Sequence, residues 1–372
     1  MKKNVIGIDA SRYKHDNPTG VEWYSYHLLN RLVPLLGRDH NSEIRLYAPE
    51  DFQLMEDTPF NVKKKIIPGK KYWTIFHFSK EMLFNRPNVL FVPSHTLPYF
   101  CPRKSIVTIH DIAFKFFKDA YTRKEYWLQN RAVKRAVRKA WKIIVPSEAT
   151  KNDLIKEYKC KAEKLVVIPH GGPDYPKLIQ WKDAEKKELL KKFGLKERDL
   201  YVFFVGRLER KKNLVRLIEG FKRVLNEYPD WKLVLAGGKG NGYEEIVEAV
   251  DKQGLSENVL MPGYISEKEK QFLMSGARIV ALPSLYEGFG LPILEAFALR
   301  RPVVTSNISS MPEVAGGGAH LVNPLDAIDI GVGLKRLVSD GFYVNKLIVQ
   351  ADEQVEKFSW EKAALKTLDL LV

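Results

Sequence analysis

Two glutamates, Glu287 and Glu295, stand eight positions apart in the stretch EGFGLPILE, which also holds two glycines, a phenylalanine and a proline. Two carboxylates can act as general acid and base when they flank a scissile bond about 5–10 Å apart. Here, however, a strand-like run, RIVALPS, leads into a loop, and Pro292 suits the first turn of a helix that continues past Glu295. Because one strand–loop–helix unit supplies both carboxylates, we expect them to contact two different parts of one extended ligand. The glycines would let the loop and the helix N-terminus approach a phosphate, although a helical glutamate taken alone is ordinarily solvated.

A second group of charges follows another strand-like run, in VGRLERKKNL at residues 205–214. Gly206 allows a tight turn, and Arg207 and Lys212 bring two cations to the beginning of a helix. Asn213 is a residue type that caps helices. Two cations at the carboxyl end of a strand suit a diphosphate, although a solvated basic turn has the same residue pattern.

Three further places have residue types suited to a ligand. His110 ends the apolar run of VTIHDIA, and Gly20 opens a helical segment in DNPTGVEWY. The turn after LMPG places Tyr264 and Ile265 where backbone groups could meet a nucleotide base. Each has a plain alternative, because a buried histidine is often structural and a glycine-rich turn is often only a turn.

Several chemistries have no motif in this sequence. No acidic cluster of the DxD type stands at a strand end, no His/Cys group has metal-ligand spacing, and no GxSxG motif occurs. We therefore expect neither a metal site nor a covalent serine. The two cysteines, Cys101 and Cys160, are too few and too far apart for a disulfide framework, which favours a reducing compartment.

The elements that must position these residues follow from short apolar runs that alternate with segments of helical spacing. Helices are predicted at 21–36, 122–142, 212–227, 243–253 and 291–300, and FSWEKAALKTLDLLV reads as a closing helix with Ser359 as its N-cap. This alternation predicts an α/β fold with parallel sheets, in which ligands bind beyond the carboxyl ends of the strands. Strands are predicted at NVIGID, EIRLYA, VLFVPS, SIVTIHD, KIIVPS, LYVFFVG, WKLVLAGG, NVLMPG, RIVALPS and RPVVTSN.

The length of 372 residues fits two Rossmann-like domains better than one core. The stretch VVIPHGGPDYPK at 166–177 is rich in glycine and proline, which is typical of a boundary. We predict domains over 1–170 and 171–357, followed by a closing helix over 358–372. Asp9 interrupts the first apolar run, so the start reads as a strand and not as a signal peptide, and no run of about 18 apolar residues predicts a membrane span.

The positive charge lies almost wholly in the first half. Residues 1–170 hold 31 lysines and arginines against 17 aspartates and glutamates, whereas the rest of the chain is nearly neutral and the net charge is +15. A basic half favours an anionic partner such as a membrane surface, a phosphorylated substrate or a nucleic acid, and solubility is the plain alternative.

The ordered set of motifs resembles the retaining, GT-B-fold glycosyltransferases of family GT4. EGFGLPILE looks like the E-x7-E signature of that family and GRLERKKN like its phosphate-binding turn. GYIS, LPSLYEGFG, RPVVTSNISSMPEVAGG and the closing FSWEKAA follow in the expected order. Two departures occur: the first loop has Gly20 where the family often has two glycines, which leaves the acceptor side open, and IPHGG has His170 where the family has Asn, which we interpret as a hinge variation.

The resemblance implies two Rossmann-like domains whose parallel sheets face a central cleft. The first domain would bind the acceptor, the second the donor, and the closing helix would cross back toward the first. It implies His110 and Glu287 as catalytic residues and Gly20 on the diphosphate and acceptor side. The donor site would comprise Arg207 and Lys212 on the diphosphate, Glu295 on the ribose, Phe289, Gly290 and Leu291 through their amides, Ser284 beside them, and Tyr264 and Ile265 at the base.

The reaction implied is transfer of a hexose from a nucleotide diphosphate sugar with retention, without a metal or a further cofactor. GDP-mannose is favoured over UDP-linked sugars, and the expected acceptor is a glycan or a lipid-diphosphate-linked glycan of a bacterial surface polysaccharide. The basic first half, and 61–80 with its lysines and aromatic residues, predict a cytoplasmic protein that binds peripherally to the inner face of the plasma membrane. A UDP-sugar enzyme with a soluble acceptor and a non-catalytic nucleotide-sugar-binding protein are the alternatives. No nucleic-acid-binding motif occurs, so we expect no nucleic acid partner.

Overall fold

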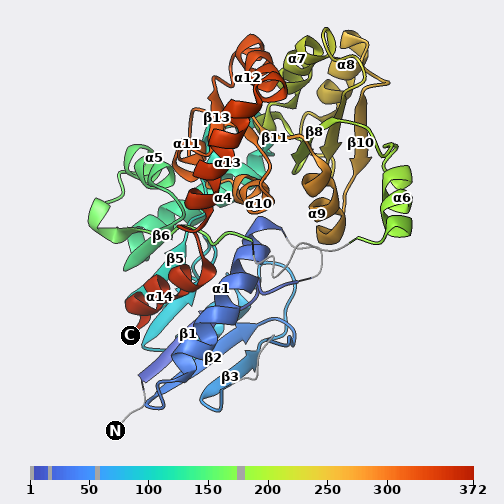
Figure 1. Cartoon of the computed structure of the whole chain (residues 1–372). Coiled ribbons are helices and arrows are strands. Elements are labelled where there is room, and N and C mark those ends of the chain that lie inside the picture. Colours follow the sequence, from blue (N-terminus) through green and yellow to red (C-terminus); the bar gives the residue numbers. More distant parts are fainter. Residues whose placement is uncertain (1–3, 16–18, 55–58, 174–180) are drawn as a thin grey trace. The chain divides into compact units, whose positions relative to one another are not determined.

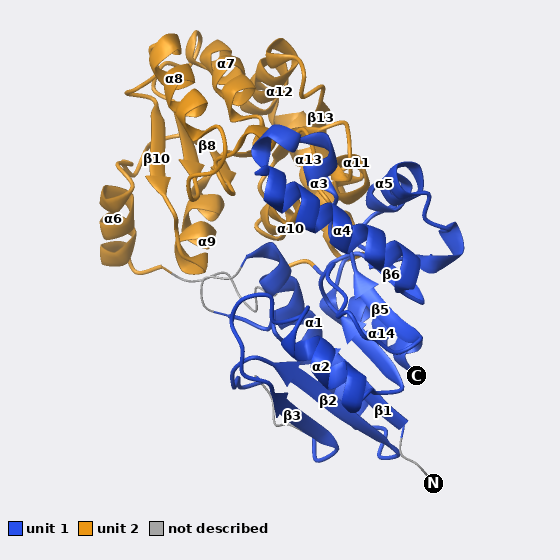
Figure 2. Cartoon of the chain, turned by 180° about the vertical axis from the view of Figure 1, so that it is seen from behind, with its two compact units in different colours: residues 1–171, 358–372 blue, residues 172–357 orange. Residues whose placement is uncertain are grey.

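The computed structural model describes residues 4–15, 19–54, 59–173 and 181–372. The chain forms two compact units, Met1–Gly171 with Phe358–Val372 and then Gly172–Lys357, which are coloured separately in Figure 2. Each unit has a parallel sheet with helices, so the predicted α/β class with two Rossmann-like domains is confirmed.

Unit 1 is a seven-stranded sheet in the order β3-β2-β1-β4-β5-β6-β7, in which every pair is parallel. The order reverses beside β1, which pairs with both β2 and β4 and so marks the place where open sheets of this kind bind ligands. The strands are β1 (Asn4–Asp9), β2 (Ser42–Ala48), β3 (Val62–Ile66), β4 (Val89–Val92), β5 (Lys104–Thr108), β6 (Lys142–Val145) and β7 (Leu165–Val167).

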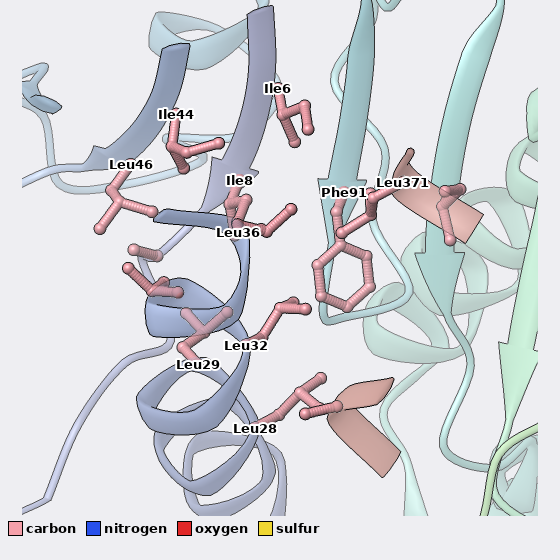
Figure 3. Close-up of a cluster of buried hydrophobic side chains, with 14 of the residues drawn as sticks. Ile6, Ile8, Leu28, Leu29, Leu32, Leu36, Ile44, Leu46, Phe91 and Leu371 are labelled. Carbon is pink, nitrogen blue, oxygen red and sulfur yellow. The ribbon is translucent and has the colours of Figure 1, made fainter. Parts of the chain in front are cut away.

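The helices of unit 1 bury apolar faces against that sheet. Figure 3 shows leucines of α1 packed against isoleucines of β1 and β2. Thr19 and Glu22 form a capping box at the start of α1. Helix α14 packs beside α1 (Figure 1). Arg31 of α1 pairs there with Glu361 of α14 at 2.8 Å. The helices are α1 (Gly20–Gly37), α2 (His77–Phe84), α3 (Ala113–Phe116), α4 (Arg123–Lys139), α5 (Glu148–Tyr158) and α14 (Trp360–Leu371), with short 3-10 turns η1 (Lys118–Ala120) and η2 (Ala162–Lys164).

Unit 2 is a six-stranded parallel sheet in the order β10-β9-β8-β11-β12-β13, whose order reverses between β8 and β11. Its strands are β8 (Tyr201–Val205), β9 (Lys232–Ala236), β10 (Val259–Gly263), β11 (Ile279–Leu282), β12 (Val303–Ser306) and β13 (Ala319–Val322). Its helices are α6 (Asp183–Lys192), η3 (Arg210–Lys212), α7 (Leu214–Leu225), α8 (Tyr243–Gln253), α9 (Glu267–Gly276), α10 (Leu291–Ala298), α11 (Met311–Ala315), α12 (Ala327–Ser339) and α13 (Gly341–Val355).

All the strands predicted from apolar runs are present, as is the Ser359 cap, whose hydroxyl accepts from the backbone of Lys362 at 3.1 Å. The helix predicted over 122–142 was too long, because α4 ends at Lys139 and Lys142 already begins β6. The boundary stretch 166–177 begins inside β7, and its residues 174–177 lie outside the described part of the chain. No helix within the described ranges is long and apolar enough to cross a bilayer.

Candidate functional site

Lys212, Ser284 and Glu287 meet at the carboxyl ends of β8 and β11. Lys212 Nζ lies 2.6 Å from Glu287 Oε1, and the Ser284 hydroxyl donates to the same oxygen at 2.6 Å. Burial would raise the pKa of Glu287, but Lys212 and then Lys211 hold it below its ordinary value. The carboxylate is therefore ionised at neutral pH, with one oxygen fixed by a cation and a hydroxyl.

Serines at the end of β12 and in the segment after it hold the loop that carries Glu287. The Ser309 hydroxyl donates to the Glu287 carbonyl at 2.7 Å, and the Ser310 hydroxyl donates to the carbonyls of Glu287 and Phe289 at 2.9 and 2.7 Å. Ser306 donates to the Ser284 carbonyl at 2.6 Å. These contacts fix the backbone on both sides of Glu287, and no sequence pattern indicated them beyond the serine-rich SNISS.

The prediction that the Asn213 side chain caps α7 is wrong. It occupies the N-cap position in a left-handed conformation with φ 61°, and its side chain makes no capping hydrogen bond. Instead the amide donates to the carbonyls of Pro283 and Pro324 at 3.0 and 2.6 Å. Asn213 therefore ties the turn that carries Lys212 to the loop that carries Ser284.

Glu295 lies inside α10 and is paired with a lysine that the sequence reading missed. Lys270 on α9 places its Nζ 2.8 Å from Glu295 Oε1 and 2.7 Å from Glu267 Oε2. Lys270 and Glu295 are only 9% and 6% exposed. Burial would lower the pKa of Lys270, but Glu295 and Glu267 raise it, so the ammonium stays charged. Glu295 Oε2 is buried and has no hydrogen-bond partner within the described residues.

Glycines bring backbone close to these side chains. Gly206 and Gly237 directly follow β8 and β9 with φ of 148° and 146°, and a Cβ on Gly237 would lie 1.8 Å from the Gly206 carbonyl oxygen. Arg207 follows Gly206 and is exposed. Gly290, with φ 114°, is the N-cap of α10, and its carbonyl accepts from the Ile293 amide at 3.0 Å. The Leu291 amide stands in the first turn, where amides have no acceptor within an α-helix.

Tyr264 and Ile265 follow β10 directly. The Tyr264 side chain is exposed and the Ile265 side chain is buried. Ser266 then caps α9 by accepting from the backbone of Glu269 at 3.3 Å. The turn thus leads straight into the helix that carries Lys270.

His110 and Gly20 belong to unit 1, whereas the residues above belong to unit 2. Burial lowers the pKa of His110 to about 4, so the ring is neutral. Its Nε2 lies 3.1 Å from the Pro93 carbonyl and must donate to it, which leaves Nδ1 to accept from His170 Nε2 at 3.4 Å. His170, which we interpreted as a hinge variation, therefore contacts the ring of His110.

Gly20 begins α1, as predicted, and a Cβ there would meet no atom within 4 Å. The open space beside it is compatible with an approaching ligand. Residues 16–18 of the same predicted loop lie outside the described residues.

Two protein families match successive parts of the chain. The family Glycosyltransferase Family 4 matches residues 18–172, and Glycosyl transferases group 1 matches residues 185–354. The chain is 25% identical over 307 residues to O-antigen chain mannosyltransferase B of Escherichia coli, which covers 81% of this chain and 77% of that protein.

Solved structures with the same fold cover nearly the whole chain. Sucrose-phosphate synthase from Thermosynechococcus elongatus superposes with a TM-score of 0.75 at 19% identity, over 99% of this chain and 98% of that one. Anabaena Alr3699/HepE, in complex with UDP and glucose, gives a TM-score of 0.73 at 16% identity, over 99% of both chains.

Proposed function

Because this chain belongs to the group 1 and family 4 glycosyltransferases and has their GT-B fold, we propose that it transfers mannose, with retention, from GDP-mannose to a lipid-diphosphate-linked glycan. That the chain is a glycosyltransferase follows from its family. The donor, the sugar, the acceptor and the residue roles are the proposal.

The buried carboxylate of Glu295 is the observation that carries it. One oxygen is held by Lys270, and the other is buried without a partner within the described residues. An unpaired buried acceptor costs free energy, which a ligand hydroxyl would recover by donating to it. A ribose presents two adjacent hydroxyls, so we assign Glu295 to the ribose of the nucleotide.

The diphosphate would be bound by cations and backbone amides. Arg207 and Lys212 both follow β8, and Lys212 uses only part of its donor capacity on Glu287. The N-terminus of α10 adds the amides of Gly290 and Leu291, which favour an anion. No catalytic metal enters this proposal, because these groups oppose the charge that develops on the leaving diphosphate.

In the proposed reaction the bond from the anomeric carbon to the diphosphate oxygen breaks, and a bond to the acceptor hydroxyl oxygen forms. The acceptor proton passes to the leaving diphosphate oxygen, so charge balances without a protein nucleophile. Glu287 would contact hydroxyls of the transferred sugar, because its second oxygen is not the one held by Lys212 and Ser284. His110, whose burial keeps the pKa low and the ring neutral, is the second residue that we propose as catalytic.

The choice of mannose rests on the relatives. The Escherichia coli protein is a mannosyltransferase of O-antigen chains, and transferring that activity to this chain is our inference. A UDP-sugar donor with a soluble acceptor is the second candidate, since the Anabaena protein of the same fold was solved with UDP and glucose.

We further propose that the chain acts in the cytoplasm, bound peripherally to the inner face of the plasma membrane. The lysines of β3 are partly neutralised, since Lys63 pairs with Glu43 at 2.8 Å. Exposed rings such as Phe76 and Trp127, with Arg131 5.1 Å above the latter, fit a membrane interface better. Sedimentation with anionic and neutral vesicles at low and high salt tests this. Binding that depends neither on the charge of the lipid nor on the salt concentration would refute it.

The donor assignment is tested by a thermal-shift panel of UDP, GDP, ADP and their sugars. A nucleotide at 100 times its Kd should add about 2.7 kcal/mol to the free energy of unfolding of unit 2, which is several degrees. Lys212→Ala should lose the shift and sugar-donor hydrolysis, whereas Lys222→Ala, an exposed lysine on α7, should keep both. Stabilisation by none of the nucleotides would contradict the proposal, and a shift without hydrolysis would indicate a binding protein.

A further inference from the structure

Unit 1 contains a cationic cavity of about 530 Å³ at the carboxyl ends of its strands. Arg12 lies beyond β1, His95 beyond β4, and Thr19 at the start of α1, while Lys70 comes from the segment after β3. No carboxylate occurs among its lining residues within the described part of the chain. This cavity, the cationic cavity, is suited to an anion.

A second cavity of about 400 Å³ has a different chemistry. Rings of Tyr13, Tyr26 and Phe52 line it, with Tyr13 centred 5.2 and 5.3 Å from the other two. The carboxylates of Glu50 and Asp51 also line it. This cavity, the aromatic cavity, combines flat apolar faces with strong hydrogen-bond acceptors.

The two cavities adjoin, because Ser11 and Pro49 line both. We propose that they form one bipartite acceptor site, which binds the phosphate groups of a glycosyl phosphate in the cationic cavity and its sugar in the aromatic cavity. The proposal rests on the proposed function, in that the sugar would be the one that receives the transferred residue.

The cationic cavity has donors that can reach a phosphate. Lys70 is exposed and forms no ion pair with another described residue, and Arg12 is half-exposed with Glu22 only at 3.7 Å. Burial lowers the pKa of His95, although the nearby Asp111 opposes this, so its neutral ring can donate one hydrogen bond without a charge. Amides at the start of the 18-residue α1 add to the attraction.

The aromatic cavity matches a sugar ring. A pyranose has apolar C–H faces, which pack on aromatic rings, and hydroxyls, which donate to carboxylates. Asp51 is occupied by Lys64 at 3.1 Å, so Glu50 is the carboxylate more available to a ligand. Volumes of 300–1,000 Å³ hold small molecules, so each cavity has room for one part of a sugar phosphate.

The test uses three probes with the full chain: inorganic diphosphate, decyl diphosphate and decyl diphosphate-linked mannose. Titrations are run with saturating GDP and UDP, which fill any nucleotide site in unit 2. Lys70→Gln should weaken all three about tenfold, the loss expected for one charge-assisted hydrogen bond, whereas Lys71→Gln, its exposed neighbour outside the cavity, should change none. Equal behaviour of these two variants would overturn the cationic half.

Glu50→Gln should weaken only the mannose-linked probe, and Phe52→Ala should do the same if it folds. The matched control is Phe60→Ala, an exposed ring outside the cavity. The proposed role of the aromatic cavity would be overturned if the mannose-linked probe binds no more tightly than decyl diphosphate, or if Glu50→Gln leaves its affinity unchanged. If decyl diphosphate binds more tightly than inorganic diphosphate, the natural glycosyl phosphate is lipid-linked. Equal affinity of the two probes indicates a soluble glycosyl phosphate. If the probes bind but no nucleotide raises the unfolding temperature, the proposed donor site is refuted and the acceptor site stands.

Discussion

Lys270→Met removes the ammonium that holds Glu295 and keeps much of the apolar stem. The lost contacts are 2.8 Å to Glu295 and 2.7 Å to Glu267, and only the first joins two buried side chains. Removing one partner of a buried pair costs about 3–5 kcal/mol.

Nucleotide affinity is the more specific measurement. Without Lys270 to hold it, a displaced Glu295 gives up charge-assisted hydrogen bonds to the ribose, worth about 1.5–3 kcal/mol, so the Kd should rise about 10- to 100-fold. The KM for the sugar donor should rise similarly while kcat changes little, because Lys270 contacts only carboxylates within the described residues.

Isothermal titration calorimetry at pH 7 compares this variant with Lys268→Met. Lys268 lies on the same helix as Lys270, α9, and its loss removes only a surface ion pair with Glu185 of α6. The double variant Lys270→Met with Glu295→Gln should regain stability, since no charge stays buried, but not affinity. If Lys270→Met weakens the nucleotide no more than Lys268→Met does, Lys270 does not position Glu295 for a ligand.

Two other predictions concern the framework of each unit. Gly237→Ala should destabilise unit 2 by about 3 kcal/mol or more and weaken nucleotide binding, because its Cβ would meet the Gly206 carbonyl oxygen at 1.8 Å. The control is Gly238→Ala, whose Cβ would have open space and should have neither effect. Urea unfolding measures both, and identical unfolding curves for the two variants would contradict this. Burial lowers the pKa of His110 from 6.5 to about 4, so between these pH values the unfolded chain binds more protons and stability falls as the pH is lowered. By pH 5 the loss of stability is about 2 kcal/mol, and His110→Gln should abolish it. An unchanged slope of stability between pH 7 and pH 5 in this variant would refute the prediction.

The sequence predicted the central strands well and the edge strands poorly. A strand buried on both faces is a continuous apolar run, as in β1 or β8. The strands that were missed, β3, β7 and β13, all lie at sheet edges, where lysines can stand in the strand and a pairing of three or four residues is enough. Their apolar patterns were therefore too short or too polar to recognise.

Some residues of the candidate site could be predicted from the sequence and others could not. Glu287 and Glu295 could be singled out because their glycine loop and helix start are contiguous in the chain. Lys270 could not, because a lysine on a helix is usually solvated and its burial depends on how α9 packs beside α10. The adjoining cavities of unit 1 were also missed, since loops from several separate strands line them.

The division of labour between the two glutamates is the central claim, and calorimetry of Glu295→Gln and Glu287→Gln tests it most directly. Each variant is titrated with the preferred nucleoside diphosphate and assayed for sugar transfer. Glu295→Gln should weaken the nucleotide at least tenfold, whereas Glu287→Gln should bind it nearly as well and lose most of the transfer rate. Equal loss of binding and transfer in both variants would contradict the account.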